Sequence, residues 1–73
     1  MSERGMKKEL LNYLKEKQVS DVLELWGNTK AFYEKKDITM GGGFNSVGYQ
    51  ISVVLREKGT DTLIRFKVGL SEV

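Results

Sequence analysis

Apolar residues recur with a helical period near the start of the chain. Over residues 6–17, Met6, Leu10, Tyr13 and Leu14 follow the spacing i, i+4, i+7 and i+8, and Leu11 widens the stripe. This spacing stacks side chains on one face of an α-helix. The segment consists largely of strong helix formers, and lysines in its last turn suit the negative end of the helix dipole. The pattern predicts an amphipathic helix over residues 6–17.

Residues 19–36 fit two patterns. As a hairpin, residues 21–26 and 29–34 are strands joined by a Gly27-Asn28 turn, and the β-branched and aromatic content favours this interpretation. As a helix, Ser20 becomes the N-cap, and the glycine inside the helix costs about 1 kcal/mol. The apolar stripe of that helix would be Val22, Leu25, Trp26, Thr29, Phe32 and Tyr33. The hairpin is preferred, and the helix stays open.

Residues 37–48 contain four glycines, an asparagine and a serine. Such a composition argues against regular structure through the whole segment. We expect a loop, or a short strand followed by a loop.

Strict alternation of apolar and polar residues predicts a hairpin at the end of the chain. A turn at Gly59-Thr60 would place every apolar partner on one face, whereas a slip of one residue would bury Arg65 and Lys67. The expected pairs are Leu55 with Ile64, Val53 with Phe66 and Ile51 with Val68. Tyr49 and Leu70 continue the same alternation at the ends of the strands.

These elements predict an α+β fold. One N-terminal helix would pack on a small antiparallel sheet of about four strands, which could curl into a partial barrel. The alternative is two helices followed by a hairpin. The length of the chain suits one domain that spans residues 1–73.

The chain contains no histidine, cysteine or proline. It therefore lacks the side chain that titrates near neutral pH, the thiol nucleophile, and the usual nitrogen and sulfur ligands of zinc. No two of its carboxylates form a convincing pair in an expected cleft; those considered are Glu24, Glu34, Asp37, Glu57, Asp61 and Glu72. We expect no cofactor, no metal and no enzymatic activity.

Composition also bears on where the chain resides. The absence of cysteine fits a reducing compartment, and charges occupy the N-terminal positions where a secretory signal needs an apolar run. No stretch approaches the roughly 20 apolar residues of a membrane span. These features predict a cytoplasmic protein with no membrane partner.

The net charge of +2 permits nucleic-acid binding without requiring it. Polar and basic residues fall on the outward face of the C-terminal hairpin: Gln50, Ser52, Arg56, Arg65 and Lys67. Such a face can follow a phosphate backbone. In the glycine-rich loop, consecutive glycines would let backbone amides approach an anion, and Phe44 could stack on a base. We therefore expect a small nucleic-acid-binding protein, although any antiparallel sheet needs a solvated face.

A protein partner is the alternative. Val54 and Leu63 interrupt the basic set and give the outward face an apolar component. A small regulator or inhibitor could act through an exposed hairpin edge or through the aromatic group Trp26, Phe32, Tyr33 and Tyr49. We also expect a homodimer or higher oligomer, with the C-terminal strand as the edge that a twofold partner completes.

The order of elements is similar to that of bacterial Sm-like RNA chaperones. LLNYLKEKQV followed by a strand resembles their N-terminal helix and first strand, and RFKVGLSEV resembles their closing strand. Val68-Gly69 stands where that family has His-Ala, its mid-sheet glycine is missing, and the three consecutive glycines are an insertion. The resemblance covers most of the chain, shares no specific motif, and assigns a role to no residue.

Overall fold

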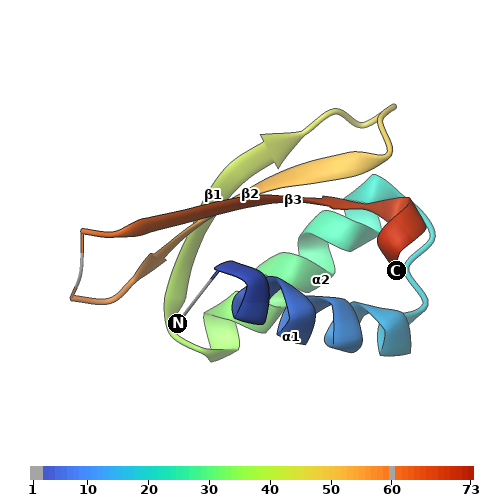
Figure 1. Ribbon diagram of the computed structural model, residues 1–73. Coiled ribbons are helices and arrows are strands. Elements are labelled where there is room, and N and C mark those ends of the chain that lie inside the picture. Colours follow the sequence, from blue (N-terminus) through green and yellow to red (C-terminus); the bar gives the residue numbers. More distant parts are fainter. Residues whose placement is uncertain (1–2, 60) are drawn as a thin grey trace.

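The computed structural model describes residues 3–59 and 61–73 and shows two helices packed against one face of an antiparallel sheet (Figure 1). In chain order the elements are α1 (Glu3–Lys17), α2 (Val22–Lys35), β1 (Ile38–Phe44), β2 (Gln50–Glu57), β3 (Leu63–Gly69) and the short 3₁₀ helix η1 (Leu70–Glu72). The strands lie in the order β1-β2-β3, so each pairs with its neighbour in sequence. The α+β class with an antiparallel sheet is confirmed.

Helix α1 agrees with the apolar spacing and begins a few residues earlier than expected. Met6, Leu10 and Leu14 are each at most 2% exposed and face the sheet and α2. Neither helix in the described part of the chain is both long and apolar enough to cross a bilayer.

The preferred hairpin over residues 19–36 is wrong, because this segment forms α2. Its N-cap is Asp21 and not Ser20: the Asp21 carboxylate accepts the Glu24 N–H at 2.8 Å. The buried residues of α2 are Val22, Leu25, Thr29 and Tyr33, all members of the expected helical stripe. Burying these four side chains outweighs the cost of about 1 kcal/mol for Gly27 inside the helix.

Residues 37–48 form a strand followed by a loop, which was one of the two expected arrangements, but the expectation of irregular structure at the glycines is wrong. Strand β1 runs through Gly41, Gly42 and Gly43, and pairs with β2 without a break from Ile38 opposite Glu57 to Phe44 opposite Ile51. Gly42 has a φ of +114°, and a Cβ there would collide with the carbonyl oxygen of Ser52. The strand therefore needs a glycine at this one position.

The C-terminal hairpin has the predicted register. Leu55 lies opposite Ile64, Val53 opposite Phe66, and Ile51 opposite Val68. Thr60, the second residue of the expected turn, lies outside the described residues. Tyr49 precedes β2 and Leu70 begins η1, so both lie outside the strands. The Leu70 N–H still donates to the Tyr49 carbonyl at 2.7 Å, which continues the predicted register by one backbone hydrogen bond.

The sheet has three strands where about four were expected, and a partial barrel is not confirmed. The difference arises because one expected strand pair is α2 and the expected loop is β1. The arrangement is thus closer to the alternative of two helices and a hairpin. It also departs from the Sm-like resemblance, since α2 occupies the segment that this resemblance assigns to the first strand.

Candidate functional site

The sheet leaves one of its faces uncovered, because both helices lie on the other side (Figure 1). We call this uncovered surface the outer face. Its residues are Thr39, Gly41 and Gly43 from β1, Gln50, Ser52, Val54 and Arg56 from β2, and Leu63, Arg65 and Lys67 from β3. Five of the six residues predicted from the sequence as a binding site therefore share this face, with Gln50 at one end of it and Arg56 at the other.

The register sets neighbours across the outer face. One row is Gly43, Ser52 and Lys67, and the next is Gly41, Val54 and Arg65. Gln50 lies opposite Gly69, at the end of the sheet beside η1. The cations of β3 thus lie beside small or apolar residues of the other two strands.

Arg65 and Lys67 are exposed and form no ion pair with any residue in the described parts of the chain. They are two residues apart on one strand, so their Cα atoms are about 7 Å apart. Arg56 differs, because its guanidinium donates to the Asp61 carboxylate at 3.2 Å. Both side chains of this pair are largely exposed, and such pairs contribute at most about 1 kcal/mol. An anionic ligand could therefore displace Asp61.

A shallow depression of about 320 Å³ lies between β2 and β3 on this side. It is lined by Ser52, Val53, Val54, Arg65, Phe66 and Lys67. Leu63, at 46% exposed, adds an apolar side chain farther along β3. The outer face therefore combines positive charge with a small apolar centre.

The part of the outer face contributed by β1 is mostly bare backbone. A Cβ added at Gly41 or Gly43 would meet no atom within 4 Å, so the fold itself leaves room for a side chain at both positions. The expectation of a flexible glycine loop is wrong, because these glycines form one side of the sheet surface. The sequence signal for this strand is that apolar side chains recur at alternate positions on either side of the glycines, at Ile38, Met40 and Phe44.

Phe44 does not join the other five predicted residues. It lies on the side of the sheet that faces the helices, half-buried, with its ring centroid 5.3 Å from that of Trp26. The rest of the aromatic group is also committed to packing: Tyr33 is buried, and Phe32 lies 4.8 Å from Tyr13. Tyr49, at 68% exposed, is the member of that group left on the surface.

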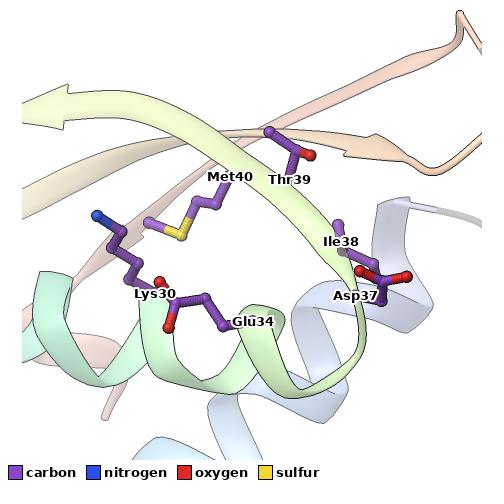
Figure 2. A pocket seen from close by; sticks show the side chains of 6 residues that line it. All are labelled: Lys30, Glu34, Asp37, Ile38, Thr39 and Met40. Carbon is purple, nitrogen blue, oxygen red and sulfur yellow. The ribbon is translucent and has the colours of Figure 1, made fainter.

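A groove that the sequence did not predict lies between α2 and β1. It has a volume of about 290 Å³ and is lined by Lys30, Glu34, Asp37, Ile38, Thr39 and Met40 (Figure 2). Lys30 and Glu34 rise from α2 toward the strand, and the Met40 side chain points down from β1 toward the helix. The helical alternative for residues 19–36 is the sequence feature that bears on this groove, because it places Lys30 and Glu34 one turn apart on one face of a helix.

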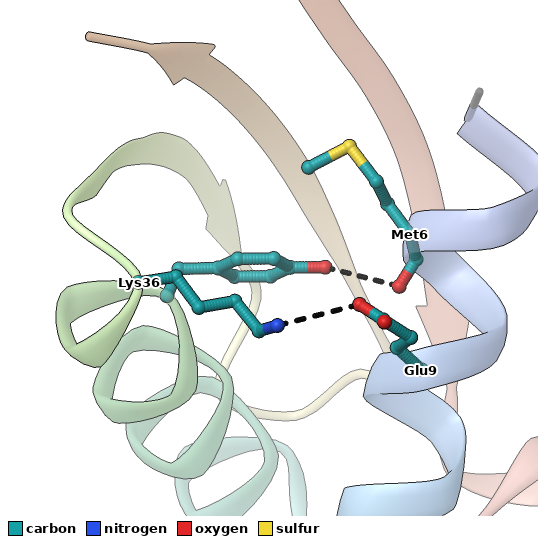
Figure 3. Close-up of polar contacts among 4 residues, drawn as sticks. Met6, Glu9 and Lys36 are labelled. Carbon is teal, nitrogen blue, oxygen red and sulfur yellow. Dashed lines mark hydrogen bonds and ion pairs between the residues drawn. The ribbon is translucent and has the colours of Figure 1, made fainter. Parts of the chain in front are cut away.

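A polar cluster at the junction of the helices is structural. The Tyr33 hydroxyl donates to the Met6 carbonyl at 3.4 Å, and the Lys36 ammonium pairs with Glu9 at 3.4 Å (Figure 3). Burial, with a smaller contribution from Glu9, raises the pKa of the Tyr33 phenol above its usual range. The phenol therefore stays protonated and holds α2 against α1.

The end of β3 is fixed to α1 through Glu72. Its carboxylate accepts the Gly69 N–H at 2.8 Å and pairs with the Lys7 ammonium at 3.0 Å. These two contacts lower the pKa of the Glu72 carboxyl, with the backbone hydrogen bond as the larger cause. This anchors the strand that carries Arg65 and Lys67.

Comparison of the chain with protein-family models, with curated proteins and with solved structures finds no match. Among the side chains that the structure describes, no three Asp or Glu residues gather where they could hold a metal ion. The function must therefore be inferred from the chemistry of the surface.

Proposed function

We propose that this protein binds nucleic acid through the outer face and has no enzymatic role. One observation carries the proposal: the outward positions of the three strands hold three cations, Arg56, Arg65 and Lys67, and no carboxylate. The net charge of the whole chain is only +2, so the outer face is more basic than the remainder of the protein. A one-sided basic surface of this kind favours a polyanion.

Arg65 and Lys67 would contact phosphates, because their charges are exposed and uncompensated. Ser52 lies opposite Lys67, and Gln50 is the next outward residue along β2; both could donate hydrogen bonds to phosphate or sugar oxygens. The bare backbone at Gly41 and Gly43 would let a ligand approach the sheet closely. Two or three phosphate contacts imply weak, salt-sensitive and largely sequence-independent binding.

A protein partner is the second candidate function. The observation that favours it is the apolar component of the outer face, namely Val54 at the depression and the exposed Leu63. A partner that covers this surface would depend on these two side chains more than on the cations.

The test is a titration of single- and double-stranded oligonucleotides at several salt concentrations between about 50 and 200 mM, where electrostatic binding weakens steeply. We expect the double variant Arg65→Ala/Lys67→Ala to bind more weakly to every sequence. Its slope of log affinity against log salt should be shallower by roughly 0.7–0.9 per lost contact. The fold should survive, because both side chains point away from the core.

A matched control removes the same amount of charge elsewhere. Lys8→Ala/Lys15→Ala changes two exposed lysines of α1, on the opposite side of the molecule from the outer face. This variant should keep the wild-type slope. Equal losses in both double variants, or no binding by the wild type at about 50 mM salt, would overturn the proposal. Loss of a protein complex with Val54→Asp or Leu63→Asp would favour the second candidate.

A further inference from the structure

Strand β1 forms an edge of the sheet that no other segment in the described parts of the chain pairs with. Its seven residues include no charged side chain and no proline, and its pairing with β2 runs without an offset. Edges are usually protected from pairing by charges, prolines, bulges or covering segments. Strand β1 shows none of these along its length.

The opposite edge is protected. Strand β3 carries Arg65 and Lys67, and its end turns into η1, which the contacts of Glu72 with Gly69 and Lys7 hold in place. The sequence pointed to the C-terminal strand as the edge for a twofold partner, whereas the structure leaves β1 as the more accessible one.

The groove beneath the β1 edge carries complementary charges. Lys30 and Glu34 lie one helical turn apart on the flank of α2 that lines it (Figure 2), and neither forms an ion pair with any side chain that the structure describes. A twofold axis beside this flank reverses the order of the two residues in a second copy. Lys30 of each copy can then meet Glu34 of the other, so the surface complements itself.

The space available also suits a second copy. Helix α2 contacts both β1 and β2, so two such helices beneath joined β1 strands would lie near the usual spacing of about 8–10 Å between packed helices. Gly27 lies on the same flank of α2 and is exposed, so no side chain at this position keeps the two α2 helices apart.

We propose that two copies of this chain pair antiparallel through their β1 edges and form one continuous six-stranded sheet. Both outer faces would then lie on the same side. The bare positions Gly41 and Gly43 of the two copies would form the centre, with an Arg65 and Lys67 row on each flank. The pairing does not depend on nucleic acid and is tested without it.

Because the natural chain has no cysteine, each introduced cysteine is a unique probe. Single cysteines at Thr39, Gly41 or Gly43 report on the β1 edge, tested alone and in pairwise mixtures to cover each register. Val54→Cys reports on stacking of two outer faces, and Arg65→Cys reports on pairing through β3. All five positions point outward, and circular dichroism confirms folding before oxidation.

Edge pairing places the Cα atoms of opposed β1 residues about 4.5–5.5 Å apart, within the reach of a disulfide. It separates the two Val54 positions by three strand spacings, or about 14 Å, beyond that reach. We therefore expect rapid disulfide formation from at least one β1 probe or mixture, and none from the cysteines at positions 54 and 65. Preferential cross-linking at position 54 or 65 would overturn the proposal.

Sedimentation of the wild-type chain should show a dimer at about 100 μM, a concentration that reveals interfaces of small area. Lys30→Glu should weaken that dimer about tenfold, since it sets like charges against each other twice. Adding Glu34→Lys should restore the dimer. A strict monomer, or a double variant that dimerises no better than Lys30→Glu alone, would contradict the pairing.

Discussion

At the scale of single residues, the three consecutive glycines have different reasons to be glycine. Gly42 has a positive φ and lies against the backbone of β2, so its lack of a Cβ is required by the fold. Gly41 and Gly43 have neither constraint, so the fold does not require glycine at either position. One composition-based interpretation of all three as a loop could not separate these roles.

We expect Gly42→Ala to destabilise the protein by at least about 2 kcal/mol, because the new Cβ forces both a disfavoured φ and a backbone collision. Chemical denaturation measures the change in the free energy of unfolding. Gly41→Ala and Gly43→Ala are the matched controls. Each should be neutral or stabilising by up to about 1 kcal/mol, since alanine restricts the unfolded chain. Equal effects at all three positions would contradict the distinct role of Gly42.

At the scale of elements, sequence periodicity predicts a helix or strand correctly where the segment fits one pattern and no other. Helix α1 and the β2–β3 hairpin were predicted with their faces and register, because slipping either would bury charges. Helix α2 was not chosen, because Gly27-Asn28 resembles a hairpin turn. The structure instead uses Asn28 within the helix, where its amide donates to the Glu24 carbonyl at 2.8 Å. A local turn signal was overridden by burial of the apolar stripe.

The anchor between β3 and α1 gives a prediction about pH. The ionised Glu72 carboxylate is favoured in the folded state, so the pKa of this carboxyl is lower there than in the unfolded chain. Its contribution to stability is present above the ordinary glutamate pKa of about 4.3 and is lost as the pH falls below it. We therefore expect wild type to exceed Glu72→Gln in the free energy of unfolding at pH 7, and this difference to shrink below about pH 4.

Denaturation curves at several pH values measure that difference. Because Glu72 is 39% exposed, solvent screening keeps the effect small, below about 1 kcal/mol. Glu16→Gln is the control, since it removes an exposed carboxylate of α1 and leaves the contacts at the end of β3 intact. A constant difference between wild type and Glu72→Gln down to pH 3 would show that the carboxylate does not hold this junction.

At the scale of the whole molecule, the candidate site was more predictable than the layer beneath it. Five of the six proposed site residues lie on the outer face because alternation alone assigns them there, whatever covers the other side. Phe44 was misplaced because its segment was not identified as a strand. The groove between α2 and β1 was missed for the same reason, since it exists only when both elements form.

The two adjacent valines of the central strand test this one-sided architecture. Val53 is 1% exposed beneath the helices, whereas Val54 lies on the uncovered outer face. A 73-residue chain has one small core and little stability in reserve. Val53→Ala should therefore cost about 2 kcal/mol or more, and Phe66→Ala about 3–5 kcal/mol, because each leaves a cavity.

Val54→Ala removes the same atoms from the other side of the same strand and should cost less than about 1 kcal/mol. Each kcal/mol corresponds to about 4–8 °C in the thermal midpoint of a chain this size, so thermal melts separate the two valine variants clearly. If the melts of Val53→Ala and Val54→Ala coincide at low protein concentration, both faces of the sheet must be covered in solution. The outer face could not then be the open surface that nucleic-acid binding requires.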